Sequence, residues 1–192
     1  MTAIAIKMYT QEEYLELERA AEYKSEYYRG EIFAMAGAGL NHTQIKENLS
    51  VEVGAFLKGK QCRGLSGDMR VHIPENTLYT YPDYLIVCGK PELLDGRKDT
   101  LLNPSVIVEI LSPSTEGYDQ GKKFHFYQGL KSLVEYVLID SQEIGARVYR
   151  KGSEGIWFLS SESYDIEGSI EIGHIGLTLK MVDIYAQTED LG

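Results

Sequence analysis

The chain has 192 residues, of which 43% are hydrophobic and 25% are charged, a composition typical of soluble globular proteins. No segment approaches the roughly 18 consecutive apolar residues of a membrane-spanning helix, and the short apolar N-terminus does not suit a signal peptide. The formal net charge of −10 argues against tight, non-specific binding to nucleic acid, because such binding depends on neutralising phosphates. We therefore expect one cytoplasmic domain over residues 1–192, with its core at about 10–185 and no membrane partner.

The first part of the chain predicts a helix, a β-hairpin and a second helix. Thr10 and Glu13 have the spacing of a capping box, which opens a helix ending at about Ala21. Residues 27–35 are typical of a β-hairpin with Gly30 in its turn. Asn41 is expected to cap a second helix. The apolar face of that helix is formed by Ile45, Leu49, Val53, Phe56 and Leu57.

Strand patterns follow this second helix. They are found at 69–73, 84–87, 106–111, 134–139, 147–150 and 156–159. Residues 106–111 are almost continuously apolar, as expected for a central strand that is buried on both faces. Helices are predicted at about 118–130 and near 180–185. This order of elements predicts an α/β domain, a mixed β-sheet flanked by helices.

Two carboxylates stand beside or inside these apolar strands. Asp83 directly precedes the strand at 84–87, and Glu109 is the one polar residue within 106–111. An acid beside a hydrophobic core is costly unless something pairs with it. Hard cations such as Mg²⁺ bind carboxylate oxygens and retain water molecules that can attack a phosphate. The sequence therefore predicts a site for Mg²⁺, or Mn²⁺, at Asp83 and Glu109.

A lysine that could complete such a site follows on the next predicted helix. Metal nucleases with strand-borne acids commonly place a lysine two residues after the glutamate, on the same face, but here that position is Leu111. Asp119, Lys123 and Tyr127 recur at intervals of four residues and share one face of the helix. Lys123 could lean over the strand end and offset charge on a phosphate. The alternative is a surface ion pair between Asp119 and Lys123.

These residues, taken in order, resemble the Uma-type restriction endonuclease family, which is abundant in cyanobacteria and belongs to the PD-(D/E)XK nuclease superfamily. The resemblance extends from about Thr10 to Tyr185. It rests on Gly30–Ile32, His42, Asp68–Val71, Tyr81–Asp83, Glu109–Thr115, Asp119, Lys123, Tyr127 and Glu135–Leu138. Its most specific part is the Glu-Ile-Leu-Ser-Pro-Ser-Thr segment with Asp119 and Lys123 behind it. The resemblance implies a restriction-endonuclease-like fold, a DNA substrate and a homodimer.

The resemblance also implies roles for individual residues. Asp83 and Glu109 would bind the metal, with Asp83 bridging metal and phosphate, and Lys123 would be the catalytic lysine. Glu31 matches an early acid of the family and would be an outer ligand or base, or else a hairpin acid that faces solvent. Asp68 would either complete the acidic cluster or cap a turn after Gly67. His42 would contact substrate phosphate or form a hydrogen bond within the first turn of its helix.

Three functions remain open at this point. The first is a metal-dependent endonuclease that hydrolyses DNA. The second is a catalytically inactive nuclease-fold protein that binds nucleic acid or a partner, which the acidic net charge favours. The third is a phosphodiesterase that acts on RNA or small nucleotides through the same metal site.

Two further expectations concern charge and cysteines. Residues 152–192 carry eight acidic residues and one basic residue, so this segment should lie away from a phosphate-binding cleft. Local basic paths could form at Lys58, Lys60, Arg63 and Arg70 or at Lys122, Lys123 and Lys131, although a solvated surface is the alternative for both. Cys62 and Cys88 form no Cys-x-x-Cys pair and are expected to be buried, reduced thiols.

Overall fold

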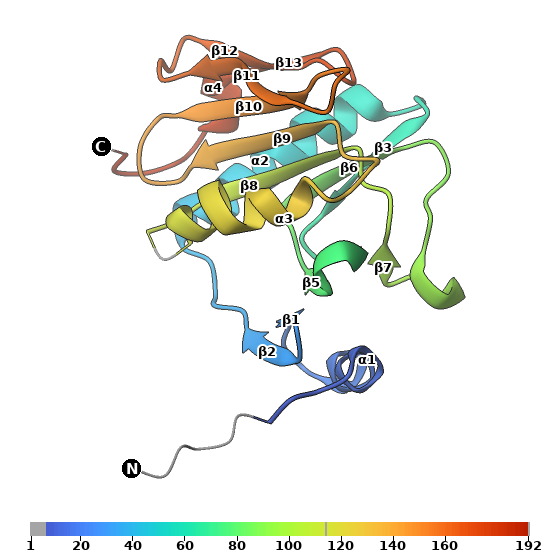
Figure 1. Ribbon diagram of the computed structural model, residues 1–192. Coiled ribbons are helices and arrows are strands. Elements are labelled where there is room, and N and C mark those ends of the chain that lie inside the picture. Colours follow the sequence, from blue (N-terminus) through green and yellow to red (C-terminus); the bar gives the residue numbers. More distant parts are fainter. Residues whose placement is uncertain (1–6, 114, 192) are drawn as a thin grey trace.

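The computed structural model describes residues 7–113 and 115–191 and is built around a six-stranded mixed sheet (Figure 1). The strands of this sheet are β3 (Cys62–Ser66), β6 (Tyr84–Cys88), β8 (Val106–Leu111), β9 (Glu135–Asp140), β10 (Ala146–Lys151) and β11 (Trp157–Ser163). Their spatial order is β11-β10-β9-β8-β6-β3. The central pair β8 and β9 is parallel, and the other neighbouring strands are antiparallel. The predicted mixed sheet is confirmed.

A five-stranded sheet lies below the larger one in Figure 1 and contains the N-terminal hairpin. It comprises β1 (Ser25–Tyr28), β2 (Glu31–Ala34), β4 (Arg70–Ile73), β5 (Leu78–Thr80) and β7 (Thr100–Leu101), in the order β2-β1-β5-β4-β7. A separate hairpin is formed by β12 (Ser169–Ile172) and β13 (Leu177–Lys180). The sequence did not predict β3, β5, β7, β12 or β13, which are short strands of two to five residues each.

Helices cover both faces of the six-stranded sheet (Figure 1). The long helix α2 (Leu40–Leu57) packs on one face, and a π-helical segment at Tyr118–Lys123, continued by α3 (Phe124–Tyr127), lies on the other. The remaining elements are α1 (Gln11–Ala20), α4 (Met181–Ile184) and two 3₁₀ turns at Pro74–Asn76 and Leu94–Gly96. Within the described residues, no helix combines the length and apolar character required to cross a bilayer.

Strand β8 divides the hydrophobic core into two parts, because its side chains alternate between the two faces of the sheet. Val108 and Ile110 pack in the cluster that contains Ile45 and Leu49 of α2. Ile107 and Leu111 belong to the cluster on the other face, with Tyr127. Glu109 shares the face of Ile107 and Leu111, and it therefore points toward the helical segment that carries Lys123.

The predicted N-terminal elements are confirmed. The Glu13 carboxylate accepts a hydrogen bond from the Thr10 backbone N–H at 2.7 Å, and the Thr10 hydroxyl accepts one from the Glu13 N–H at 3.2 Å. Arg29 and Gly30 form the two-residue turn of the hairpin with φ of +48° and +97°. Positive φ at both positions matches the right-handed twist of the two strands.

The predicted N-cap of the second helix is wrong. Helix α2 starts at Leu40 and its N-cap is Gly39, whereas Asn41 lies inside the first turn. The Asn41 amide donates to the Glu189 carbonyl oxygen at 2.7 Å, and its side-chain oxygen accepts the Glu189 N–H at 3.0 Å. The Asn41 side chain, which the local sequence predicted as the N-cap, thus binds the backbone of Glu189, 148 residues away.

The expectation of two reduced cysteines is also wrong, because Cys62 and Cys88 form a disulfide. Antiparallel pairing of β3 with β6 places the two residues directly opposite each other, with their Cα atoms 4.0 Å apart. Both are partly buried against the core. The two cysteines are 26 residues apart in the sequence, so only the strand register reveals this pairing.

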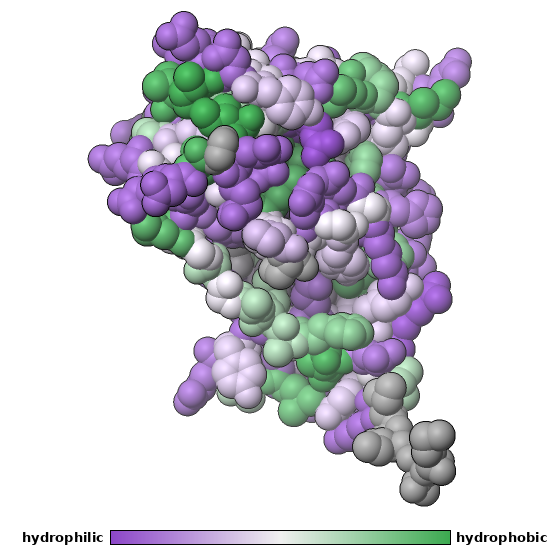
Figure 2. Space-filling model, turned by 90° about the vertical axis from the view of Figure 1, so that its left-hand side faces the viewer, coloured by the Kyte–Doolittle hydropathy of each residue, from purple (hydrophilic) through white to green (hydrophobic). Residues whose placement is uncertain are grey.

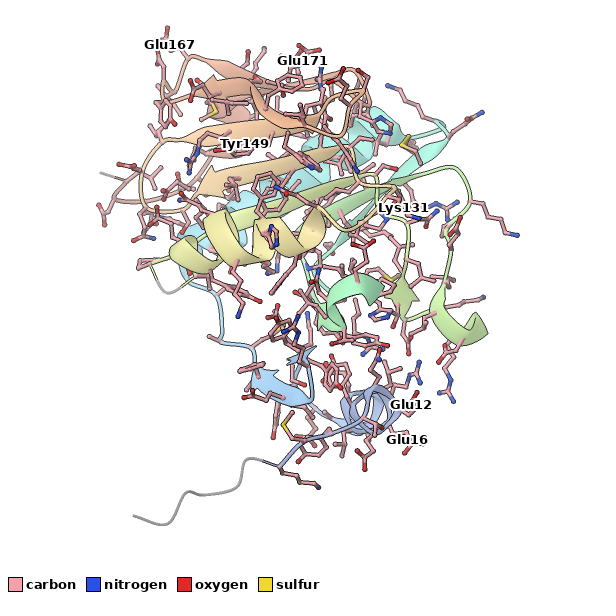
Figure 3. The ribbon with its side chains drawn as sticks, viewed as in Figure 1. Glu12, Glu16, Lys131, Tyr149, Glu167 and Glu171 are labelled. Carbon is pink, nitrogen blue, oxygen red and sulfur yellow. A yellow bond between two sulfur atoms is a disulfide. The ribbon has the colours of Figure 1, made fainter. Side chains whose placement is uncertain are left out.

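The surface is mostly hydrophilic on the face drawn in Figure 2, with hydrophobic groups gathered at its upper and lower ends. Figure 3 shows Glu167 and Glu171 at the β12–β13 end of the molecule, apart from the segment that leads into α3. These two members of the acidic C-terminal segment therefore lie apart from the segment that carries Lys123.

Candidate active site

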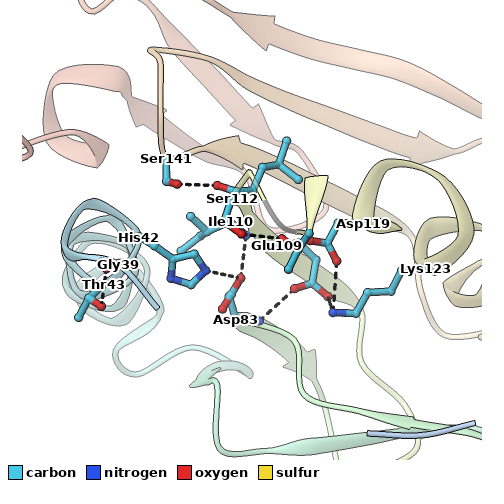
Figure 4. A network of polar contacts seen from close by, with 12 residues as sticks. Gly39, His42, Thr43, Asp83, Glu109, Ile110, Ser112, Asp119, Lys123 and Ser141 are labelled. Carbon is cyan, nitrogen blue, oxygen red and sulfur yellow. Dashed lines mark hydrogen bonds and ion pairs between the residues drawn. The ribbon is translucent and has the colours of Figure 1, made fainter. Parts of the chain in front are cut away.

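Asp83 and Glu109 lie together where β6 and β8 pair. The strand register pairs Tyr84 with Val108, so Asp83 and Glu109 are the next opposing residues. The Asp83 carboxylate accepts the Ile110 backbone N–H at 2.8 Å, and the Asp83 N–H donates to Glu109 Oε2 at 3.3 Å (Figure 4). The two acids singled out from the sequence are therefore brought into one cluster by the strand pairing.

Lys123 reaches the same cluster from the helical segment at Tyr118–Lys123, which covers the face of the sheet toward which Glu109 points. Its Nζ lies 2.9 Å from Glu109 Oε1, and the Tyr127 hydroxyl donates to the same carboxylate oxygen at 2.8 Å. The side chains of Glu109 and Lys123 are only 3% and 7% exposed. Lys122 points elsewhere, because its Nζ lies 4.8 Å from the centre of the Tyr28 ring. The structure thus places Lys123, rather than Lys122, at the strand-borne acids.

Two more carboxylates surround the Lys123 ammonium. Asp119 Oδ1 lies 3.4 Å from Nζ, as the spacing on the helix suggested, and the pair is buried rather than on the surface. Glu26 Oε1, from β1, lies 3.6 Å from Nζ and also accepts a hydrogen bond from the Thr80 hydroxyl. Glu26 was missed in the sequence, since a glutamate in a hairpin strand gives no local signal of its distant partner.

Burial and the neighbouring charges shift the pKa values of Glu109, Asp119 and Lys123. Burial raises the pKa of Glu109 to about 8 despite the adjacent ammonium of Lys123. Burial also raises the pKa of Asp119. Burial alone would lower the pKa of Lys123, but the neighbouring carboxylates, with Glu109 the strongest, outweigh it and hold that pKa well above its ordinary value. Lys123 is therefore a fixed cation within a cluster that has an excess of carboxylates.

His42 holds the other side of Asp83. Its Nε2 lies 3.2 Å from Asp83 Oδ2, and its Nδ1 is buried and has no hydrogen-bond partner within the described parts of the chain (Figure 4). Although burial pushes the pKa of Asp83 upward, the hydrogen bond from His42 and the Ile110 N–H hold it below its ordinary value. The sequence left open whether His42 contacts substrate phosphate or forms a hydrogen bond within the first turn of its helix. Among the described residues its ring forms no hydrogen bond within that turn and is directed at the Asp83 carboxylate.

Two of the predicted supporting acids lie outside this network. Asp68 is 89% exposed at its side chain and pairs with Lys24 Nζ at 2.5 Å, which lowers the pKa of Asp68. It stands in the turn between β3 and β4, in agreement with the alternative of a turn residue. Glu31 begins β2 opposite Tyr28 and takes no part in the contacts around Glu109. The early acid that reaches the site is Glu26, five residues before Glu31.

The donor set suits a hard divalent cation only in part. Asp83 and Glu109 could supply carboxylate oxygens, and a bound cation would favour the ionised form of the carboxyl groups that outnumber Lys123. Among residues 7–113 and 115–191, however, no three histidine, cysteine, aspartate or glutamate side chains form a ready-made metal site. A cation at Asp83 and Glu109 would therefore complete its coordination with backbone oxygens and water, as Mg²⁺ commonly does.

A cavity of about 320 Å³ adjoins the cluster at the first turn of α2. It is lined by Gly39, Leu40, Asn41, His42, Ser112, Pro113, Ser141, Gln142, Glu189 and Asp190. The presence of Glu189 and Asp190 contradicts the expectation that the C-terminal acids as a group lie away from the site. The hydrogen bonds between Asn41 and Glu189 explain the difference, because they fasten the end of the chain to the start of α2.

Comparison with known proteins gives matches over most of the chain. The family model Uma2, described as "Putative restriction endonuclease", matches residues 11–169. Two proteins of Synechocystis sp. are similar: sll1609 is 36% identical over 172 residues, covering 88% of this chain and 97% of that protein. The second, slr1290, is 35% identical over 176 residues, covering 91% of this chain and 90% of that protein.

The fold has a counterpart among solved structures. The crystal structure of a putative nuclease belonging to DUF820 from Anabaena variabilis superimposes with a TM-score of 0.72, at 20% identity, and covers 91% of this chain and 96% of that one. This likeness is one of fold, consistent with the PD-(D/E)XK type. Since the family model spans most of the sequence, the chain belongs to the Uma2 family of putative restriction endonucleases.

Proposed function

We propose that the protein is a metal-dependent endonuclease that hydrolyses phosphodiester bonds in DNA at Asp83, Glu109 and Lys123. The observation that carries this proposal is the junction of β6 and β8, where the Asp83 N–H donates to Glu109 Oε2 and Lys123 Nζ lies 2.9 Å from Glu109 Oε1. Two carboxylates and one ammonium from three separate elements meet there. This combination suits a reaction in which a phosphate gains negative charge beside a cation.

Asp83 and Glu109 would hold Mg²⁺ or Mn²⁺, which supplies an activated water and neutralises charge on the phosphate. The chain itself fixes the two ligands before substrate arrives. His42 and the Ile110 N–H orient the Asp83 carboxylate, and the Tyr127 hydroxyl orients that of Glu109. Such partners of metal ligands commonly determine both ligand orientation and affinity for the metal.

Lys123 would act as a permanent cation rather than as a base. Its pKa is held well above the ordinary value of lysine by the surrounding carboxylates, so the ammonium retains its proton at neutral pH. A fixed ammonium can stabilise the charge that develops on a phosphate in the transition state. Asp119 supports this role by holding Nζ at 3.4 Å, one helical turn before the lysine.

A phosphodiester in RNA or in a small nucleotide is the second candidate substrate. The observation that favours it is the position of Glu189 and Asp190 on the cavity beside His42. Their charge would repel the backbone of a long duplex on that flank.

Cleavage of both strands of a DNA duplex would require two active sites, because one site cuts one strand. The simplest arrangement that supplies two sites is a two-fold homodimer.

The test is incubation of the purified protein with supercoiled plasmid, single-stranded DNA and single-stranded RNA, each with Mg²⁺, Mn²⁺ or EDTA. We expect cleavage that requires the divalent cation and disappears in Asp83→Asn and Glu109→Gln. Glu31→Gln is the matched control, since Glu31 lies outside the network and should leave cleavage intact. Equal cleavage by wild type and Asp83→Asn, or none by the wild type on any substrate, would reject the proposal.

A further inference from the structure

Lys46 lies beside the candidate active site without a carboxylate partner. It stands one helical turn after His42 on α2, and its side chain is partly buried. Within the described residues Lys46 forms no ion pair, in contrast to Lys24, Lys123 and Arg19. The Asp68 carboxylate is near enough to interact with its charge, but a partly buried ammonium that forms no ion pair recovers little of its lost hydration, so a bound anion would be favourable there.

The Lys46 ammonium lies close to the turn between β3 and β4. A β-carbon built on Gly67 would lie 3.7 Å from Lys46 Nζ and 3.4 Å from the Asp83 carbonyl oxygen. Gly67 therefore lies between the Lys46 ammonium and the backbone of Asp83, which is a proposed metal ligand. A side chain at position 67 would occupy the space between them.

A second ammonium approaches the same turn from the other side. Lys24 Nζ donates to the Gly67 carbonyl oxygen at 2.7 Å and lies 5.4 Å from the centre of the Tyr81 ring. It also pairs with the exposed Asp68 carboxylate. The ammonium groups of Lys24 and Lys46 thus both lie near Gly67. Both lower the pKa of the neighbouring Asp68 carboxyl, and Lys24 has the larger effect. This part of the surface has an excess of positive charge.

The preceding turn of α2 has the opposite charge. The cavity at Gly39–His42 is bordered by Glu189 and Asp190. His42 therefore stands between a negative flank, at the start of α2, and a positive flank, at Lys46 and Gly67. A polyanion that reaches Asp83 would be attracted to the second flank and repelled from the first.

We propose that Lys46, with Lys24, binds a backbone phosphate of the nucleic acid next to the phosphate that is cleaved, so that the strand leaves the site over Gly67. This inference rests on the proposed nuclease function and adds the direction of the strand and the residues that hold it. Lysine binds phosphate as a point charge and is suited to a backbone contact that does not depend on sequence. Asp68 competes with the phosphate for Lys24 and weakens the contact.

Binding of a fluorescein-labelled 12-mer of single-stranded DNA, measured by anisotropy with Ca²⁺ in place of Mg²⁺ and over a series of salt concentrations, tests this assignment. Lys46→Gln should weaken binding by roughly five- to tenfold at low salt and reduce the slope of log K against log salt by about 0.7, the value for one phosphate of a single strand. Asp68→Asn should instead tighten binding. Lys58→Gln, at the other end of the same helix, should leave both quantities unchanged.

Equal weakening by Lys46→Gln and Lys58→Gln would overturn the assignment, because it would show a response to total charge alone. Failure of the wild-type protein to bind the 12-mer would overturn it as well. Neither result depends on cleavage, so the inference and the proposed function fail separately. A wild-type protein that binds through Lys46 but cuts no substrate would reject the nuclease and retain the strand-binding site.

Discussion

Lys123 Nζ lies 2.9 Å from Glu109 Oε1, although Glu109 belongs to strand β8 of the central sheet and Lys123 to the helical segment that covers one face of it. In the commoner arrangement the lysine follows the glutamate by two residues on the strand, but Leu111 occupies that position here and is buried. The helical segment at Tyr118–Lys123 restores the ammonium to the same face. The helical segment, rather than strand β8, therefore carries the lysine that contacts Glu109.

Replacement of Lys123 tests its proposed role directly. Lys123→Ala should lower turnover by about 100-fold or more, the scale of a lost electrostatic contact to a transition state. Lys122→Ala should retain turnover, since Lys122 faces Tyr28. Because Lys123→Ala also leaves Glu109 without its ammonium, circular dichroism and thermal unfolding should accompany the kinetics. Equal turnover of wild type and Lys123→Ala, or loss in Lys122→Ala alone, would show that the assignment is wrong.

Divalent cations should stabilise the folded protein through Asp83 and Glu109. Any ligand that binds only the folded state adds stability by mass action, about 2.7 kcal/mol at a concentration of 100 Kd. Differential scanning fluorimetry should therefore show a rise in Tm with Mn²⁺ that EDTA reverses. The rise should be absent in Asp83→Asn and present in Asp68→Asn, because Asp68 lies outside the acidic cluster. A similar rise in both variants would place the cation elsewhere.

Acid should destabilise the protein in part through His72. Burial lowers the pKa of His72 below its ordinary value of 6.5, and its ring stacks on Tyr79 with the centroids 4.0 Å apart. Below pH 6.5 the unfolded chain takes up a proton that the folded chain resists, so the stability that His72 contributes is complete above pH 6.5 and is lost as the pH falls.

The corresponding variant is His72→Gln, which cannot take up this proton in either state. Urea unfolding between pH 7.5 and 5 should show the wild type losing stability faster than the variant below pH 6.5. Curves for the two proteins that stay parallel across this range would exclude a contribution from His72.

The disulfide between Cys62 and Cys88 should stabilise the fold. Closing a loop between residues 26 positions apart restricts the unfolded chain, and the loop-entropy relation gives about 3.5 kcal/mol. Dithiothreitol, or the double replacement of both cysteines by serine, should lower the urea midpoint accordingly. Dithiothreitol should have no effect on the double variant. Unchanged midpoints in all conditions would mean that the thiols are unpaired in the protein.

The sequence by itself determined the features that depend on near neighbours. The capping box of Thr10 and Glu13 is a contact across three residues, and the buried strand Val106–Leu111 is encoded in its own run of apolar side chains. Asp83 and Glu109 could be singled out for the same reason, since an acid at the edge of or inside an apolar run is visible locally. The helical position of Lys123 also follows from spacing along one segment.

Tertiary structure alone decided the features that join distant parts of the chain. The approach of Glu26 to Lys123, the disulfide of Cys62 with Cys88 and the attachment of Glu189 to Asn41 each depend on strand register or on docking of the C-terminal segment. Strands of two or three residues, such as β5 and β7, likewise exist only because partners align with them. The hydrophobic pattern within one segment does not indicate which distant segment will pack against it. That choice depends on how the chain as a whole buries its apolar surface.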